Sequence, residues 1–246
     1  MTKVRLGKTE IITNKNGFGA LPIQRIPYEE AEALIYKAYD NGMTFFDTAR
    51  FYTDSEEKLG RAIAKRGIRE QVYIASKTMC NTTEEFWSQL AQSLSDLRTD
   101  YLDLYQFHNP AFCPKPGDGT GLYEAMLEAK AQGKVRHIGI TNHRLKVAHE
   151  AVAHEAIDSG LYETLQFPFC YLASEQDAAL VEKCKQADMG FIAMKAMSGG
   201  LITRADAAYA FLSQYDHVLP IWGVQKMAEL REFLACEQNP PEMYKE

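Results

Sequence analysis

The sequence lacks the features that mark membrane-spanning, secreted and nucleic-acid-binding proteins. None of its apolar runs approaches the roughly eighteen residues that a membrane-spanning helix requires. The basic residues near the amino terminus precede no apolar signal segment, which predicts a cytoplasmic protein. No stretch is dense in lysine or arginine, and the formal net charge is −6. We therefore expect neither nucleic acid nor an anionic membrane as a main partner.

Cysteine is scarce, and its spacing argues against several kinds of metal and redox site. The five cysteines are scattered along the chain, at Cys80, Cys113, Cys170, Cys184 and Cys236. No two of them have the C-x-x-C spacing that is typical of zinc sites, iron–sulfur centres and redox dithiols. We therefore expect reduced thiols, as in other cytosolic proteins, and no metal site.

The chain also lacks a linker, and it alternates short apolar runs with longer amphipathic segments. No segment rich in proline, glycine or serine interrupts it, which indicates a single domain over residues 1–246. The apolar runs are four to six residues long and cover positions 17–20, 44–48, 72–76, 102–107, 137–140, 164–167, 191–194 and 218–221. Such runs are typical of strands buried on both faces of a parallel sheet.

Helix signals lie between these runs. Pro27 can begin the first helix, and Thr82 and Glu85 have the spacing of a capping box before the third. Ser174 precedes a helix that we expect to run to about Ala187. Successive strands lie about 30 residues apart, which is the spacing of a βαβ repeat.

Eight strands alternating with eight helices predict an α/β fold, a closed (β/α)8 TIM barrel rather than an open doubly wound sheet. The length of 246 residues agrees with the roughly 250 that are typical of this barrel. Before the first barrel strand, residues 4–6 and 11–13 flank Gly7-Lys8. These two short segments predict a β-hairpin that plugs the floor of the barrel.

Polar residues end most of the predicted strands. Asp47, Lys77 and His108 end three consecutive ones, and burying such groups in an apolar barrel would cost several kcal/mol. Each alone is more often a helix cap or a hydrogen-bonded core residue. Because TIM barrels carry their chemistry at the carboxyl ends of the strands, the three together predict a site. Further polar or small residues follow the later strands: Thr141, Asn142, Gln166, Lys195, Ser198, Gly199, Gly200, Gly223 and Gln225.

Five segments resemble motifs of the aldo-keto reductase family. They are FDTARFYTDSEEKLG at 46–60, IASKT at 74–78, LYQFH at 104–108, IGITNH at 138–143 and LQFPF at 165–169. The likeness extends over nearly the whole chain, in the family's order and spacing. Around Met194 the chain resembles the iron–sulfur-linked bacterial branch of the family. The resemblance implies an oxidoreductase with a TIM-barrel fold and a nicotinamide cofactor.

The resemblance also implies roles for four catalytic residues. Tyr52 would be the general acid that protonates the substrate's carbonyl oxygen, and His108 would orient this carbonyl. Lys77 would lower the pKa of Tyr52, and Asp47 would keep Lys77 charged and in place. An ammonium about 4 Å from a phenolate contributes roughly 4 kcal/mol at an effective dielectric constant of about 20, which lowers a phenol pKa near 10 by as much as about three units. A phenol shifted in this direction is a better general catalyst near pH 7.

The same resemblance implies a site for the nicotinamide end of the cofactor. Asn142 and Gln166 would bind the carboxamide, with Thr141 beside them. Met194 stands where many relatives have an aromatic residue, and its thioether would pack on the ring.

The other end of the cofactor would bind at the last strands. Ser198, Gly199 and Gly200 would let the backbone approach the pyrophosphate, at the start of a predicted helix. The adenosine-binding end would comprise Gly223, Gln225, Lys226 and Glu232. The charge of Lys226 favours NADP(H), with NAD(H) as the alternative. Phe233 stands where the family usually has Asn, so we expect adenine recognition to differ.

Substrate contacts are expected from the loops. Residues 239–246 follow the last helix closely, without the family's long substrate loop or an iron–sulfur domain, so we expect an open pocket. The non-periodic segment 109–120 follows His108 and predicts a lid or pocket wall. Phe51, Phe112 and Trp222 could supply aromatic walls, although core packing is the commoner role of each.

Three functions are compatible with these residues. The first is an NADP(H)-dependent reductase of aldehydes or ketones, with a small-molecule carbonyl substrate. The second is a Schiff-base lyase that acts through Lys77, although such an enzyme has no use for the cofactor-binding residues. The third is a cofactor-binding sensor or interaction subunit with little turnover. The sequence assigns neither the particular substrate nor the oligomeric state.

Overall fold

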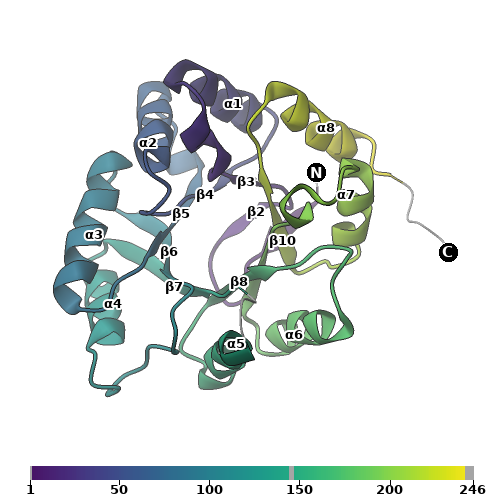
Figure 1. Ribbon diagram of the computed structural model, residues 1–246. Coiled ribbons are helices and arrows are strands. Elements are labelled where there is room, and N and C mark those ends of the chain that lie inside the picture. The colour runs from purple at the N-terminus through teal and green to yellow at the C-terminus, as the bar shows by residue number, and fades with distance from the viewer. Residues whose placement is uncertain (1, 144–146, 242–246) are drawn as a thin grey trace.

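Eight parallel strands form a closed barrel, and the α-helices surround it (Figure 1). The computed structural model describes residues 2–143 and 147–241. Around the barrel the strands are β10 (Val218–Gly223), β3 (Gly17–Gly19), β4 (Phe45–Asp47), β5 (Tyr73–Thr78), β6 (Leu102–His108), β7 (Val135–Thr141), β8 (Thr164–Pro168) and β9 (Gly190–Met194). Each predicted apolar run overlaps one of these strands, so the prediction of a TIM barrel is confirmed.

The helices with signals at Pro27, Thr82 and Ser174 begin close to them. None of the helices that the structure describes is long and apolar enough to cross a membrane. They are α1 (Tyr28–Asp40), α2 (Ser55–Arg66), α3 (Thr83–Asp96), α4 (Leu122–Ala131), α5 (Val147–Ser159), α6 (Glu175–Gln186), α7 (Ala205–Ser213) and α8 (Met227–Gln238), with the 3-10 turns η1 (Pro22–Arg25), η2 (Arg69–Gln71) and η3 (Ser198–Gly200). Pro27 precedes α1, and Ser174 caps α6. At α3 only half of the predicted capping box forms. Thr82 Oγ1 accepts a hydrogen bond from the Glu85 N–H, but the Glu85 carboxylate accepts from the Asn81 N–H instead of that of Thr82.

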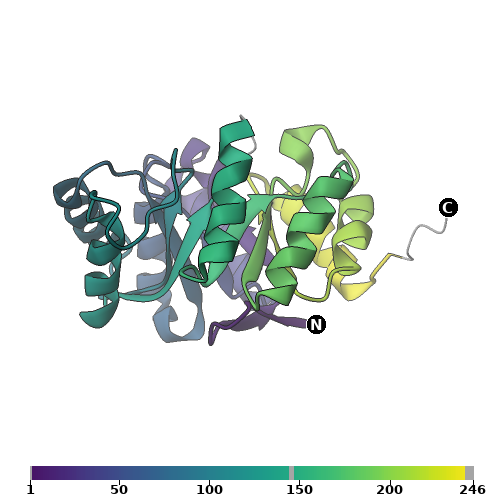
Figure 2. The same ribbon diagram turned by 90° about the horizontal axis from the view of Figure 1, so that it is seen from below.

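A two-stranded hairpin covers the floor of the barrel, as predicted. Strands β1 (Lys3–Arg5) and β2 (Ile12–Asn14) pair in antiparallel fashion, and Figure 2 shows them at one end of the barrel. Their buried neighbours Val4, Leu6 and Ile11 pack against apolar side chains of the barrel strands. Apolar side chains therefore fill this end of the barrel interior. Residues 242–246, part of the segment from which an open pocket was predicted, lie outside the described residues.

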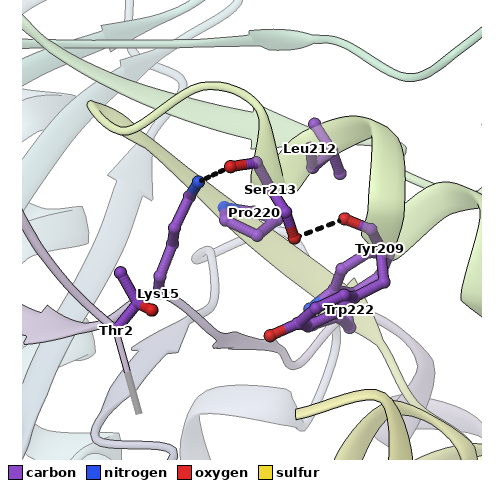
Figure 3. A pocket seen from close by; sticks show the side chains of 7 residues that line it. All are labelled: Thr2, Lys15, Tyr209, Leu212, Ser213, Pro220 and Trp222. Atoms are coloured by element: carbon purple, nitrogen blue, oxygen red, sulfur yellow. Dashed lines mark hydrogen bonds between the residues drawn. The ribbon is translucent and has the colours of Figure 1, made fainter. Parts of the chain in front are cut away.

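Lys15 ties the hairpin to the outer layer of helices (Figure 3). Its Nζ donates to the Ser213 carbonyl oxygen at 3.1 Å, at the C-terminal end of α7, where the helix dipole favours a cation. A cavity of about 50 Å³ lies beside it, and Trp222 forms part of the wall. Burial lowers the pKa of Lys15 to about 8, against the opposing effect of Asp216.

Candidate active site

The four residues predicted to be catalytic meet at the carboxyl ends of neighbouring strands. Asp47 ends β4, Lys77 is the penultimate residue of β5, and His108 ends β6. Lys77 Nζ lies 2.7 and 2.8 Å from the Asp47 carboxylate oxygens and 2.6 Å from the Thr48 carbonyl oxygen. Tyr52 lies in the loop between β4 and α2. Its ring centroid is 5.2 Å from Lys77 Nζ and 5.8 Å from the centroid of the His108 ring.

Asp47 and Lys77 form a buried ion pair, with side chains that are 3% and 1% exposed. Burial acts to lower the pKa of Lys77, but the Asp47 carboxylate and the Tyr52 oxygen raise it above its usual value. Burial raises the pKa of Asp47, and Lys77 opposes this effect. With three acceptor oxygens around its ammonium, Lys77 is held protonated and fixed in place.

The pKa of Tyr52 is shifted in the direction opposite to the prediction. Burial raises this pKa, and Lys77 lowers it by less, so the net shift is upward. Taking a phenolate out of water costs more here than the nearby ammonium recovers. Tyr52 is therefore protonated near pH 7 and can donate a proton. Lys77 is then available to stabilise the phenolate that remains.

His108 is a neutral imidazole at physiological pH. Burial lowers its pKa to about 3, and the positive charge of Lys77 and the neighbouring His143 add to the effect. The centroids of the two imidazole rings are 5.9 Å apart. The buried Nδ1 of His108 has no hydrogen-bond partner among the residues that the structure describes. A neutral imidazole donates through one nitrogen only, which suits a group that binds a carbonyl oxygen.

The loop after β7 presents a buried side-chain amide, that of Asn142. The Asn142 N–H donates to the Gln166 carbonyl oxygen at 3.0 Å. Asn109, with a φ of 52°, donates from its N–H to Thr141 Oγ1 and accepts at Oδ1 from the His143 N–H. Asn142 is fully buried, yet within residues 2–143 and 147–241 neither atom of its side-chain amide has a partner. An unpaired buried amide is costly, and a ligand carboxamide would satisfy both atoms.

Gln166 is already hydrogen-bonded to Gln106, a residue that was not among the predicted site residues. Its Oε1 accepts from Gln106 Nε2 at 2.8 Å, and its Nε2 lies 3.4 Å from an Asp47 oxygen and 3.9 Å from Met194 Sδ. A signal for Gln106 was present, because it lies two positions before His108 in β6. The alternation of a strand turns both side chains into the barrel.

The turn predicted to approach the cofactor pyrophosphate has a different structure from the one expected. Ser198–Gly200 form a 3-10 turn, and α7 begins only at Ala205, so the prediction that this turn opens a helix is wrong. The φ angles of Lys195 and Ser198 are 54° and 48°, and those of the two glycines are also positive. Left-handed backbone cannot continue into an α-helix. Both glycines are exposed, so their backbone is accessible to a ligand.

The adenosine-end candidates lie at β10 and α8. The N–H groups of Gln225 and Lys226 both donate to the Glu229 carboxylate, at 2.8 and 3.0 Å. The side chains of Lys226 and Glu232, as well as Gly223, are exposed. The structure thus gathers these candidates along one helix and the strand before it.

Trp222 has the core-packing role that the sequence favoured over a substrate wall. Trp222 is fully buried, and its ring stacks on that of Phe233 with centroids 4.5 Å apart, in the layer between barrel and helices. A large aromatic ring at a strand end packs as well outside the barrel as inside it, and its sequence position does not distinguish the two. Phe51 and Phe112, which are 53% and 42% exposed, do lie in loops at the carboxyl ends of strands.

The fold and the buried Asp–Lys pair beside a tyrosine and a neutral histidine define a TIM-barrel protein with an acid–base site. Residues 15–210 match the model of the Aldo/keto reductase family. The match covers most of the chain, so the protein belongs to this family.

Curated relatives carry names from the same family. The chain is 37% identical over 133 residues to methylglyoxal reductase DkgB of Salmonella typhimurium, covering 52% of this chain and 48% of that protein. It is 30% identical over 181 residues to the aldo-keto reductase YhdN of Bacillus subtilis, covering 69% and 52%. The chain thus spans about half the length of the curated relatives it matches.

Solved structures share the fold. The holo form of an aldo-keto reductase from Bacillus halodurans has a TM-score of 0.83 at 18% identity, covering 98% of this chain and 92% of that one. An aldo-keto reductase from Klebsiella pneumoniae, solved in complex with NADPH, has a TM-score of 0.77 at 23% identity, covering 100% and 97%. The resemblance to the iron–sulfur-linked branch stays a prediction of the sequence.

Proposed function

We propose that this protein is an oxidoreductase that uses NADP(H) to reduce aldehydes or ketones to alcohols. The observation that carries the proposal is the position of Tyr52, between the buried Lys77–Asp47 pair and the neutral His108. Two similar proteins support it: DkgB is named a methylglyoxal reductase, and the Klebsiella pneumoniae structure contains NADPH.

The chain's residues divide the work as follows. Tyr52 donates its proton to the carbonyl oxygen, and Lys77 stabilises the resulting phenolate. His108 orients the same oxygen through a second hydrogen bond. The amide of Asn142, which has no partner among the residues described, fits a nicotinamide carboxamide, and Lys226 at the start of α8 suits a 2′-phosphate. When bound, the cofactor supplies the hydride that reduces the carbonyl carbon.

The geometry disfavours a Schiff-base lyase. Such an enzyme needs an unprotonated lysine, whereas the Lys77 ammonium is surrounded by three acceptor oxygens and its pKa is raised. A cofactor-binding sensor would make the same contacts with the cofactor. Only a measurement of turnover distinguishes it from a reductase.

The decisive variant is Tyr52→Phe, which removes the proton donor and keeps the ring. We expect kcat to fall at least about hundredfold, while NADPH affinity stays within about twofold. The measurements are NADPH oxidation with methylglyoxal and benzaldehyde, and fluorescence titration of the cofactor. The matched control is Tyr101→Phe, far from the site, whose ring keeps its stacking on Arg69 and Arg136. If Tyr52→Phe retains the parental rate, the assigned donor is wrong.

The cofactor preference is tested at Lys226. We expect Lys226→Ala to weaken NADPH binding about tenfold and NADH binding little, because only NADPH carries the 2′-phosphate. Titration of both cofactors with the parent and the variant gives the comparison. Equal losses for the two would remove the basis for preferring NADP(H).

A further inference from the structure

Gln106 lies in the barrel interior, one layer nearer to the floor than His108. In the register of the sheet it is the β6 partner of Lys77 in β5, and its side chain is fully buried. Its Nε2 donates to Gln166 Oε1 at 2.8 Å, whereas its Oε1 has no partner among the described residues. The contact with Gln166 is thus the one side-chain hydrogen bond that Gln106 forms within the described part of the chain.

A glycine in the neighbouring strand makes room for this contact. Gly139 of β7 lies between Gln106 of β6 and Thr164 of β8 in the sheet register. A Cβ atom at Gly139 would lie only 2.9 Å from Gln106 Cγ and 2.3 Å from Thr164 Oγ1. Because β7 has no side chain at this position, Gln106 can reach across it to β8.

The hydrogen bond fixes which end of the Gln166 amide faces Asp47. The two ends of an amide are similar in size, so their orientation follows from their hydrogen-bond partners. The donor of Gln106 holds Gln166 Oε1 and leaves Nε2 directed at an Asp47 oxygen, 3.4 Å away. Burial raises the pKa of Asp47, and Lys77 and the Gln166 amide lower it. A reversed amide would place an oxygen against the carboxylate, where two acceptors repel each other.

We infer that Gln106 is a positioning residue for the reaction. It holds Gln166 with its N–H toward Asp47. This contact in turn helps to keep Asp47 paired with Lys77, beside the proton donor Tyr52. The inference rests on the proposed function, in which the pair stabilises the phenolate. A buried side chain in this layer can also serve only to fill space, so the test separates the hydrogen bond from packing.

The first variant is Gln106→Met, which removes the donor and keeps an unbranched side chain that fills the same space. We expect kcat at saturating NADPH and methylglyoxal to fall about fivefold, because Gln166 is no longer held. Urea unfolding should show no loss of stability, since the substitution also removes the buried Oε1 that lacks a described partner. If the variant keeps the parental kcat, the inference is wrong and the proposed function stands.

A double-mutant cycle with Gln166→Leu separates the route through Gln166 from packing. In the Gln166→Leu background, Gln106→Met should change kcat by less than about 1.5-fold, because the group through which Gln106 acts is gone. The matched control is Thr164→Val, which removes another buried oxygen without a described partner from the same layer. It should keep kcat within about 1.5-fold of the parent. Losses that multiply in the cycle, or an equal loss in the control, would overturn the inference.

Side-chain amide spectra test the orientation of Gln166 without any turnover. In protein labelled with ¹⁵N-glutamine, the NH₂ signals of Gln166 are identified by their loss in Gln166→Leu. They should shift or broaden in Gln106→Met and keep their positions in Thr164→Val. Unchanged Gln166 signals in Gln106→Met would overturn the inference even where kcat falls. If the wild type reduces no carbonyl, the proposed function fails, and these spectra alone decide whether Gln106 positions Gln166.

Discussion

The floor and the mouth of the barrel both bury polar side chains, and they satisfy them to different extents. At the floor, Asp103 near the start of β6 accepts from Arg69 at 2.8 Å, from Arg136 at 3.1 Å and from the Ile74 N–H at 2.9 Å. The same strand ends at the mouth in His108, whose buried Nδ1 lacks a partner in the described part of the chain. One strand thus carries a closed polar network at one end and an open one at the other.

Glu163 before β8 repeats the floor pattern. Its carboxylate accepts from Lys130, from His137 and from the Ile138 N–H, each at 2.8 Å. Burial acts to raise its pKa, but the hydrogen bonds from His137 and Lys130 lower it to about 2. Because this pKa lies below that of the unfolded chain, Glu163 contributes stability above about pH 4.5 that is lost as the pH falls toward 2.

The mouth concentrates costly groups around the candidate site. The Asn142 amide is buried without partners in the described residues, and Asn109, Lys195 and Ser198 have positive φ angles. Unpaired polar groups and left-handed backbone cost free energy. The floor has such features too, at Asn16 Oδ1, Arg98 and Asp188, but there they adjoin no candidate site. The comparison teaches that the floor stabilises the barrel, whereas the mouth keeps hydrogen-bonding capacity for a ligand.

The largest expected contrast is between Asp47→Asn at the mouth and Asp103→Asn at the floor. Asp47→Asn removes the countercharge of Lys77, so we expect turnover per folded molecule to fall about hundredfold or more. Asp103→Asn leaves two arginines without their carboxylate and should lower the free energy of unfolding by about 3 kcal/mol, with turnover retained. NADPH oxidation and urea unfolding measure the two effects. Equal turnover losses in both variants would contradict the proposed division of roles between the floor and the mouth.

A smaller contrast concerns two buried asparagines. Asn142→Ala should weaken NADPH binding about tenfold, or about 1.4 kcal/mol, without lowering the melting temperature, because the amide that it removes has no described partner. The control is Asn16→Ala near the floor, where a buried Oδ1 likewise lacks a partner among the described residues. Cofactor titration and thermal unfolding apply to both. Unchanged NADPH affinity in Asn142→Ala would contradict the assigned role.

The smallest effect is expected at Lys15, which connects the hairpin at the floor to α7. Its pKa in the folded state is about 8, below the usual 10.5, so between these values the unfolded chain binds more protons. The free energy of unfolding should therefore rise with pH from about 8 to 10.5 by about 1 kcal/mol, allowing for solvent screening. Lys15→Met should abolish this rise in urea titrations at pH 7.5 and 10. Persistence of the rise would mean that another group causes it.

Local patterns were sufficient for the strands, for the starts of α1, α3 and α6, and for three of the four catalytic candidates, whereas Tyr52 was implied by the resemblance to the family. The apolar runs and the residues that end them follow the chain, and the carboxyl ends of parallel strands must meet at one mouth, so Asp47, Lys77 and His108 could be placed together in advance. The hairpin plug could also be predicted from the sequence, because its alternation of buried and exposed residues is local.

Other features depended on which side chains meet in space. The contact of Gln106 with Gln166 joins β6 to β8, two strands that are far apart in the sequence. The upward shift of the Tyr52 pKa depends on how deeply the ring is buried, and no motif reports burial.

The sequence by itself determined the barrel, its floor plug and the identity of the groups at its mouth, because periodicity and strand ends are properties of short segments. Only the tertiary structure decided which polar atoms are satisfied and which remain open. That balance depends on distances between strands that are far apart in the chain, and on how much water the folded barrel excludes from each group.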